Sequence, residues 1–519
     1  SAPDPKNLAR LLRLAGLLAA GAAAAADSPV DLGTRRELFV DDALIARLSG
    51  GARSRLHHPE PREIVLVHDA PWEGSGSGYH SVFQDGDRYR MYYKAWQLTV
   101  TPGKVDTKEH PLWCAYAESD DGIRWRKPSL GLHAFEGSTA NNIVIGAGKL
   151  GAVHPDGGHP AVFKDENPAA PADARYKAIV RSEGRRGLLA LKSPDGIRWT
   201  PMSDQPVITD GAFDSQNLAF WDGARGVYRA YWRYFTGGTT DEKQWKPAGF
   251  RAIRTATSRD FLKWEDQRDL TYVDSPDEHL YTNQIKPYHR APHLLLGFPA
   301  RYVERSWSPS LNALPEREHR EWRSGASKRY GTAMTDGLLM ASRDGVRFKR
   351  WNESFLRPGI ERPGTWNYGQ QYIAWHLVET KSAWEGAPNE LSLYATESYW
   401  TGRSSEVRRY TLRLDGFVSI NAPMSGGELV TRSITFTGRS LTVNFATSAA
   451  GDLRAELQDA DGRPLPGFTL EESDPAFGDA IERTLHWKAG SDVSALAGRP
   501  VRLRFVLRDA DLYAFRFAP

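Results

Sequence analysis

The sequence predicts an all-β protein, a five-bladed β-propeller followed by a C-terminal β-sandwich of the jelly-roll kind. One turn motif recurs four times along the chain. Short runs with alternating apolar and polar residues precede each copy, as expected for half-buried strands. Helical periodicity is nearly missing after residue 27, which argues against a mixed α/β barrel.

The repeated motif joins a strand, an Asp-Gly-like turn and an aromatic residue. Its copies are "AESDDGIRW", "LKSPDGIRW", "ATSRDFLKW" and "MASRDGVRF", which end at Trp125, Trp199, Trp264 and Phe348. The intervals of 74, 65 and 84 residues (199−125, 264−199, 348−264) show that insertions vary within a constant unit. Such repetition is typical of propeller blades. A fifth, less regular unit contains "WNYGQQYIAWHL", "LSLYATESYW" and "VRRYTLRLDG" and predicts a fifth blade.

Composition shifts set the expected domain boundaries. Residues 1–26 combine basic residues, an Ala- and Leu-rich run and a small-x-small site, which predict an export signal and a secreted or periplasmic protein. An Ala-rich tail is the alternative reading. Residues 27–416 are assigned to the propeller, and the run "RRELFVDDALI" from Arg35 is expected to complete its last blade. Residues 417–519 alternate cleanly without the blade motif and are assigned to the sandwich.

Bulk composition excludes several functional classes. Lys and Arg number 67 against 64 Asp and Glu, a difference of +3, so no basic excess points to nucleic acid. No later apolar run approaches the roughly 20 residues of a membrane span. The single cysteine, Cys114, excludes an intrachain disulfide and is expected to pack inside a strand. The 11% aromatic content suits a β core and stacking against sugars, and we expect an oligo- or polysaccharide partner.

Polar residues open the first strand of each predicted blade. In a propeller these strands line the central channel, so their polar entries converge on one pocket. The entries are His80 in "YHS", His159 in "GHP", Asp214 in "DSQN", Tyr281, Asn283 and Gln284 in "YTNQ", and Gln370 in "NYGQ".

Some of these stretches resemble a known superfamily. "DSQNLAFW" is similar to the general-acid stretch of the invertase, levansucrase and arabinanase propellers (glycoside hydrolase families 32, 43 and 68), which places Asp214 at the acid position. "GHPAV" resembles their second-blade stretch, with His159 where the family carries a stabilising Asp. Gly78 or Tyr79 stands where the family has its nucleophile. The resemblance spans roughly residues 37–416 and implies an exported glycoside hydrolase that removes a non-reducing-end sugar, acidic or furanose. The chain also looks like uncharacterised secreted bacterial proteins related to family 32.

Glycosidase chemistry requires two groups across the scissile bond. Asp214 is the first candidate. Glu278 is the best-placed second carboxyl, with Glu73 and Asp42 in reserve. A histidine, His80 or His159, is the alternative base, because an imidazole titrates near neutral pH.

Basic and aromatic residues suggest how a substrate is held. Lys94, Arg181 and Arg233 each follow a tyrosine by five positions, and Arg301 and His376 extend the series. Facing the pocket mouth, they would form a cationic ring for an acidic sugar or for phosphate; ordinary paired arginines are the alternative. The candidate stacking platforms are Trp72, Trp96 and Trp366.

Three alternatives use the same residues differently. His80, His159 and Asp214 together could ligate a central divalent cation, calcium or zinc, and no other cofactor is indicated. The chain lacks two carboxylates that the family carries, and this absence favours the second alternative, a non-catalytic glycan-binding propeller. A phosphate-dependent phosphorylase of the same architecture is the third.

Overall fold

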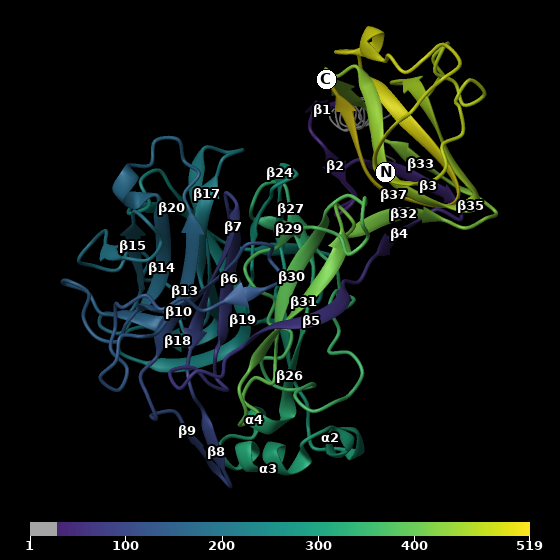
Figure 1. The fold of residues 1–519 in the computed structure, drawn as a ribbon. Coiled ribbons are helices and arrows are strands. Elements are labelled where there is room, and N and C mark those ends of the chain that lie inside the picture. The colour runs from purple at the N-terminus through teal and green to yellow at the C-terminus, as the bar shows by residue number, and fades with distance from the viewer. Residues whose placement is uncertain (1–27) are drawn as a thin grey trace, which may run out of the picture. The chain divides into compact units, whose positions relative to one another are not determined.

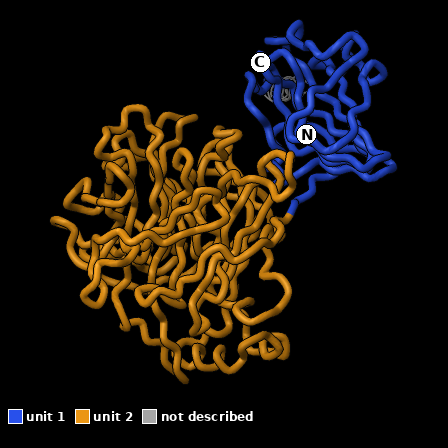
Figure 2. The backbone as a smooth tube through the Cα atoms, viewed as in Figure 1, with its two compact units in different colours: residues 1–57, 415–519 blue, residues 58–414 orange. Residues whose placement is uncertain are grey.

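The computed structural model describes residues 28–519, which form two compact units (Figure 2). One unit takes the chain up to His57 together with Asp415–Pro519, and the other takes His58–Leu414. The predicted export signal lies outside the described residues. Both units consist almost entirely of β-strands, which confirms the all-β class. Within residues 28–519, no helix has the length and apolar character needed to cross a membrane.

The larger unit is a succession of antiparallel sheets built from strands that are neighbours in the sequence (Figure 1). Such local pairing is expected where a turn motif repeats. The first sheet contains β6 (Gly78–Asp85), β7 (Arg88–Ala95), β10 (Trp113–Ser119), β11 (Trp125–Arg126) and β12 (Ile143–Ile145); the second contains β13 (Pro155–Lys164), β14 (Tyr176–Ser182), β15 (Leu188–Ser193) and β16 (Thr200–Pro201); the third contains β17 (Leu218–Asp222), β18 (Val227–Thr240), β19 (Trp245–Ser258) and β20 (Trp264–Asp269).

The next sheet breaks the pattern slightly, because its edge pair β21–β28 is parallel. The sheet after it is completed by a strand from the start of the unit. The former contains β21 (Thr271–Val273), β23 (Lys286–Tyr288), β24 (Ala291–Gly297), β27 (Met340–Ser342) and β28 (Arg347–Arg350); the latter contains β29 (Val378–Thr380), β30 (Glu390–Glu397), β31 (Glu406–Arg413) and β5 (Glu60–Val67).

The strand expected to close the ring was wrongly placed. β5 pairs with β31, whereas β2 (Glu37–Leu38), inside the run from Arg35, pairs with β37 (Val501–Ala518) in the smaller unit. The reason is burial. Leu38, Phe39 and Val40 are almost fully buried and need an apolar core, while β5 is exposed or half-buried along most of its length, which suits an outer strand.

The four turns share one hydrogen-bonding pattern. In the first, the Asp121 carboxylate accepts from the backbone N–H groups of Ile123 and Arg124, both at 2.8 Å, and the Ser119 hydroxyl accepts from that of Gly122 at 2.9 Å. Burial alone would raise the pKa of Asp121, but these donors outweigh it and lower the pKa to about 2. The same pattern recurs around Asp195, Asp260 and Asp344. The repeated motif is thus an Asp-capped turn.

A small insertion that the sequence did not predict carries the helices of the described chain (Figure 1). Between β25 (Ala300–Glu304) and β26 (Ala333–Gly337) lie α2 (Pro309–Ala313), α3 (Arg317–Ala326) and α4 (Arg329–Thr332), and β22 (His279–Leu280) joins the same sheet. The hairpin of β8 (Thr99–Thr101) and β9 (Lys104–Asp106) contacts α3. These helices are too short to show periodicity in a sequence.

The smaller unit has one ten-stranded sheet, in which β37 pairs with more strands than any other. Its first four strands come from residues 30–56, which the sequence had assigned to the propeller. They belong here because they pair with β32–β34 and β37. The division into two packed layers stays a prediction. Besides β2 and β37, the strands are β1 (Val30–Gly33), β3 (Ile45–Gly50), β4 (Arg53–Leu56), β32 (Val418–Ala422), β33 (Gly427–Thr431), β34 (Ile434–Phe436), β35 (Ser440–Asp459) and β36 (Asp479–Thr484).

Candidate active site

Two buried glutamines tie together the inner strands of the larger unit. Gln216 Nε2 donates to the carbonyls of Tyr79 and Pro160, at 3.1 and 3.2 Å. Gln284 Nε2 donates to Gln216 Oε1 at 2.8 Å and to the Ile373 carbonyl at 2.7 Å. Because these amides satisfy backbone acceptors deep in the core, Gln284 holds the strands together and does not face a substrate as the sequence suggested.

A histidine between two carboxylates lies at the ends of the second and third sheets. His159 Nδ1 contacts Asp156 Oδ2 at 2.5 Å, and His159 Nε2 contacts Asp214 Oδ1 at 3.1 Å. Asp156 is 1% exposed and also accepts from Arg181 Nη1 at 2.9 Å. The Asp214 side chain, by contrast, is 60% exposed. The sequence had singled out His159 and Asp214 but missed Asp156, three residues before His159 at the start of β13.

The charges in this array reinforce one another. Burial would lower the pKa of His159, but Asp156 and Asp214 outweigh it and raise the pKa. Desolvation would raise the pKa of Asp214, yet His159, Arg233 and Arg181 hold it well below its ordinary value. The array therefore presents an ionised carboxylate to solvent, backed by a histidine whose other ring nitrogen is fixed by a buried carboxylate.

The Asp214 carboxylate opens into a polar pocket of about 390 Å³. Its walls come from the β14–β15 connection and from the tip of the β18–β19 hairpin. The lining residues are Arg181, Ser182, Glu183, Gly184, Arg186, Gly187, Phe213, Asp214 and Trp245.

Tyrosines pack beside the array and keep water from its inner side. Tyr79 lies 5.6 Å from the His159 ring and stacks on Tyr372 at 5.9 Å. Tyr372 stacks in turn on Tyr281 at 5.4 Å, and the Tyr281 and Tyr368 hydroxyls share a hydrogen bond of 2.7 Å. The sequence had singled out Tyr281 as a binding residue and had noted Tyr79 at the start of an inner strand. Tyr368 and Tyr372 lie in an irregular segment before β29.

Lys94 is the basic residue most deeply enclosed by this cluster. It is 3% exposed, and its Nζ donates to the Tyr399 hydroxyl at 2.7 Å. The rings of Tyr79, Tyr399 and Trp96 surround it, with centroids at 4.5, 5.0 and 5.2 Å. Burial lowers the pKa of Lys94 to about 7, although the charges of Asp214 and Asp156 oppose the shift. A lysine in this state can give and take a proton near neutral pH.

The predicted cationic ring is only partly assembled. Arg233 is buried near Asp214, and its Nε donates to the Ala212 carbonyl at 3.1 Å. Arg301 instead pairs with Asp336 at 2.7 Å. His376 is fully buried beside Phe298, 5.0 Å between rings. Lys94, Arg181 and Arg233 therefore influence Asp214, whereas Arg301 and His376 belong to other surroundings.

Glu278 does not join Asp214 as a second carboxyl. It accepts from Arg350 at 3.2 Å and lies 3.5 Å from Arg301, so two guanidinium groups neutralise it. With Arg301 and Trp366 it lines a separate pocket of about 920 Å³. Arg301 in β25 and the buried Arg350 in β28 thus hold Glu278 in an ion-pair network.

His80 faces away from the array. Its Nε2 lies 3.1 Å from His68 Nε2, and His68 Nδ1 contacts the Ser405 carbonyl at 2.9 Å. Burial lowers the pKa of His80 to about 3, so it stays neutral. The proposed metal set of His80, His159 and Asp214 is thus not brought together. In residues 28–519, no group of three or more His, Cys, Asp or Glu side chains could hold a metal ion.

The remaining predicted residues have structural partners. Asn283 Oδ1 accepts from Ile285 N at 3.1 Å, and Gln370 Nε2 donates to the Pro358 carbonyl at 3.4 Å. Trp96 and Trp366 donate to the Thr107 and Gly359 carbonyls. The remainder are Trp72, which packs edge-on against Phe135; Glu73, which is buried with Lys127; Asp42, which lies in the smaller unit; and Cys114, which is fully buried as expected.

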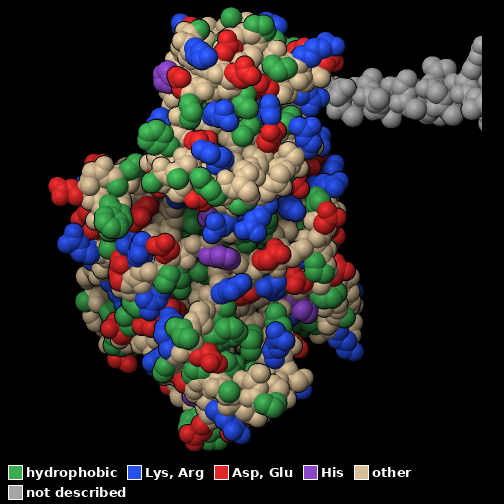
Figure 3. All heavy atoms as spheres, turned by 90° about the vertical axis from the view of Figure 1, so that its right-hand side faces the viewer, with side chains coloured by type: hydrophobic (Ala, Val, Ile, Leu, Met, Phe, Trp, Pro, Cys, Tyr) green, Lys and Arg blue, Asp and Glu red, His purple; other side chains and the backbone are tan. Residues whose placement is uncertain are grey.

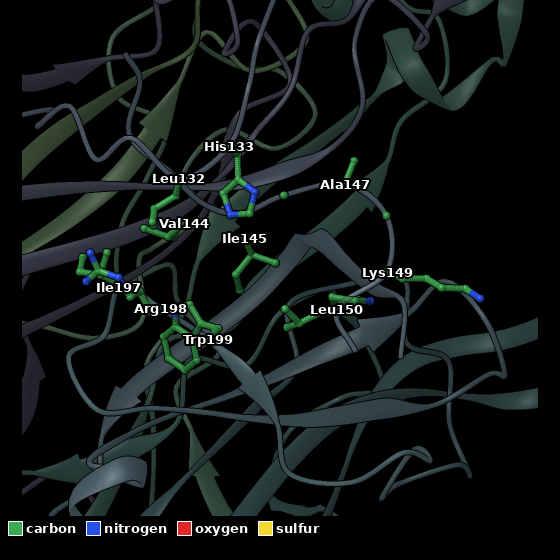
Figure 4. Close-up of a pocket in the computed structure, with 13 residues that line it drawn as sticks. Leu132, His133, Val144, Ile145, Ala147, Lys149, Leu150, Ile197, Arg198 and Trp199 are labelled. Atoms are coloured by element: carbon green, nitrogen blue, oxygen red, sulfur yellow. The ribbon is translucent and has the colours of Figure 1, made fainter. Parts of the chain in front are cut away.

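Other surfaces offer less chemistry. A pocket of about 270 Å³ is lined mostly by apolar side chains such as Leu132, Ile145 and Trp199, with no carboxylate among its residues (Figure 4). On the face drawn in Figure 3, Lys and Arg are interspersed with Asp and Glu, without a large patch of one sign. The Asp214 pocket is therefore the strongest candidate for catalysis.

No family model matches the sequence, and no curated protein matches it either. Solved structures with a similar fold include the catalytic domain of a GH62 α-L-arabinofuranosidase from Coprinopsis cinerea (9% identity, 69% of this chain and 97% of that one, TM-score 0.40). The RS223 β-xylosidase has 12% identity over 69% and 97%, with a TM-score of 0.41. An N-acetylgalactosamine deacetylase from F. plautii, in complex with blood group B trisaccharide, has 11% identity over 71% and 97%, with a TM-score of 0.40. Two of these neighbours are glycosidases by name.

Proposed function

We propose that the chain is a glycoside hydrolase whose reaction takes place at Asp214. The observation that carries the proposal is the hydrogen-bonded series Asp156–His159–Asp214, which starts at a buried carboxylate and ends at an exposed, ionised one in a pocket. A carboxylate held ionised is suited to attack an anomeric carbon and to leave it again. This reverses the acid role that the sequence resemblance implied for Asp214.

Lys94 is the proposed proton donor. The acid and the base of a catalytic pair are recognised by environments that push their pKa values apart. Here the pKa of Asp214 is held well below its ordinary value, while burial lowers the pKa of Lys94 to about 7. In the first step an Asp214 oxygen bonds to the anomeric carbon, the glycosidic C–O bond breaks, and the leaving oxygen takes a proton from Lys94. Water then gives a proton to neutral Lys94, its oxygen bonds to the anomeric carbon, and the bond to Asp214 breaks. The configuration at that carbon is retained.

His159 is a positioning residue in this scheme. Both of its ring nitrogens are occupied, so it acts on Asp214 and not on the sugar. We further infer five blades in the larger unit, a sandwich in the smaller one, and export directed by residues 1–26. A glycan is the expected substrate, with the sugar at the non-reducing end removed.

The test uses leaving groups of different acidity. The protein is incubated with 4-nitrophenyl glycosides, whose leaving group needs no proton, and with oligosaccharides of the same sugars. Lys94→Met is expected to keep the first-turnover release of 4-nitrophenol while losing at least 100-fold on oligosaccharides. Asp214→Asn is expected to lose both, since it removes the nucleophile.

Asp210→Asn is the matched control, because Asp210 is an exposed carboxylate four residues away that pairs with Arg254. Equal activity of Asp214→Asn and wild type would refute the role of Asp214, and a wild-type protein that hydrolyses none of these glycosides would refute the hydrolase. Sugar 1-phosphate released only when phosphate is present would identify a phosphorylase. Sugar binding that Asp214→Asn leaves intact, in a protein without turnover, would identify a glycan-binding protein.

A further inference from the structure

An arginine and a tryptophan form the far wall of the Asp214 pocket. Arg186 lies in the β14–β15 connection, and Trp245 begins β19 at the tip of the β18–β19 hairpin, where it pairs with Thr240. The guanidinium carbon of Arg186 lies 5.0 Å from the centroid of the Trp245 ring. The two residues come from neighbouring sheets, so the pocket is walled by both.

Arg186 has hydrogen-bonding capacity to spare. Its Nη1 is shielded from solvent and has no hydrogen-bond partner. Such a nitrogen is energetically unfavourable until an acceptor reaches it. Arg181, the other basic residue of the pocket, already donates to Asp156. The acidic residues that face the same space are Glu183 and Asp214. An anionic ligand is therefore favoured only where Arg186 can meet it, away from these carboxylates.

Trp245 supplies a surface for a ring. The residue is 44% exposed, although its edge packs against Phe235 at 6.2 Å. An exposed indole offers a flat apolar face, which suits the C–H face of a pyranose or furanose. Beside Arg186, this face fits a sugar that carries a carboxylate, because a guanidinium binds that group through two parallel hydrogen bonds.

We propose that Arg186 and Trp245 form a subsite for a uronic acid unit, adjoining the sugar that reacts at Asp214. The subsite rests on the proposed function for its position in the reaction, but not for its ability to bind. A small rotation of the Arg186 side chain turns Nη1 into the pocket, where it forms an ion pair with the carboxylate while Trp245 stacks on the ring. Acidic polysaccharides are then the substrate class.

The test measures binding by calorimetry, with digalacturonate as the probe and the neutral disaccharide of the same linkage beside it. Asp214→Asn is used as the background so that no turnover interferes. Digalacturonate is expected to bind at least tenfold tighter than the neutral sugar, and Arg186→Gln is expected to remove that preference. Trp245→Ala is expected to weaken both sugars.

Arg185→Gln is the matched control, because Arg185 is the adjacent arginine and pairs with Glu242 outside the pocket. Equal binding of acidic and neutral disaccharides, no binding of either, or equal effects of Arg185→Gln and Arg186→Gln would overturn the subsite. Failure of the proposed function has a different signature, because the wild-type protein would then hydrolyse no glycoside, or turnover would survive in Asp214→Asn, whatever digalacturonate does.

Discussion

Replacing Asp156 by Asn tests how His159 is held. Asn keeps the oxygen that accepts from Gly158 N at 2.8 Å, so the local turn is retained. Its NH₂ group, however, replaces the oxygen that contacts His159 Nδ1 at 2.5 Å. A hydrogen bond to a charged group contributes about 1.5–3 kcal/mol, and 1.36 kcal/mol corresponds to one pKa unit. The pKa of His159 is therefore expected to fall by about 1–2 units in Asp156→Asn.

The assay is an NMR titration of the His159 ring proton, assigned by its loss in His159→Gln. Because the folded-state pKa of His159 is raised, the stabilisation from this pair is present in full below pH 6.5 and is lost as the pH rises through the folded-state value. Asp156→Asn should thus lose more stability at pH 6 than at pH 9. Asp165→Asn, which breaks another buried pair with Lys177, is the control. An unchanged His159 pKa in Asp156→Asn, or an equal shift in Asp165→Asn, would refute the reasoning.

Three further predictions concern stability, measured by chemical denaturation. The folded-state pKa of Lys94, about 7, lies below its ordinary value of 10.5. The free energy of unfolding should therefore rise as the pH increases from about 7 to 10.5, and this rise should be lost in Lys94→Met. Asp195→Ala removes the acceptor of two turn N–H groups and should cost about 1–3 kcal/mol, whereas exposed Asp204→Ala should cost almost nothing; equal costs would contradict the capping role. Gly369→Ala places a Cβ 2.0 Å from Tyr399, whereas a Cβ added at Gly359 has free space around it. Gly369→Ala should therefore cost about 1–3 kcal/mol more stability than Gly359→Ala. A similar loss in both variants would mean that Tyr399 moves freely.

The sequence predicted what local patterns determine. The Asp-capped turns were visible because their Asp and Gly positions follow from short-range hydrogen bonds. Asp214 and His159 were found because the starts of inner strands converge in a propeller. Lys94 was found for its charge, but its aromatic cage was not, since Tyr399 lies about 300 residues further along the chain.

Other assignments failed where long-range packing decided the outcome. Glu278 looked well placed beside an inner strand, yet Arg350 and Arg301 drew it into a separate network. The run from Arg35 had the pattern of a closing strand, but its buried Leu38 and Phe39 pack in the smaller unit. A one-dimensional pattern specifies that a strand forms and which face is apolar, but not which of two cores that face joins.

The most direct measurement of the central claim is the identity of the residue that becomes glycosylated. The protein is incubated with a series of 2-deoxy-2-fluoro glycosides bearing a dinitrophenyl leaving group, and the digested protein is then examined by mass spectrometry. The account predicts one added sugar on the peptide that contains Asp214, and no added sugar in Asp214→Asn. An adduct on any other carboxylate, or hydrolysis of these glycosides with inversion at the anomeric carbon, would contradict it.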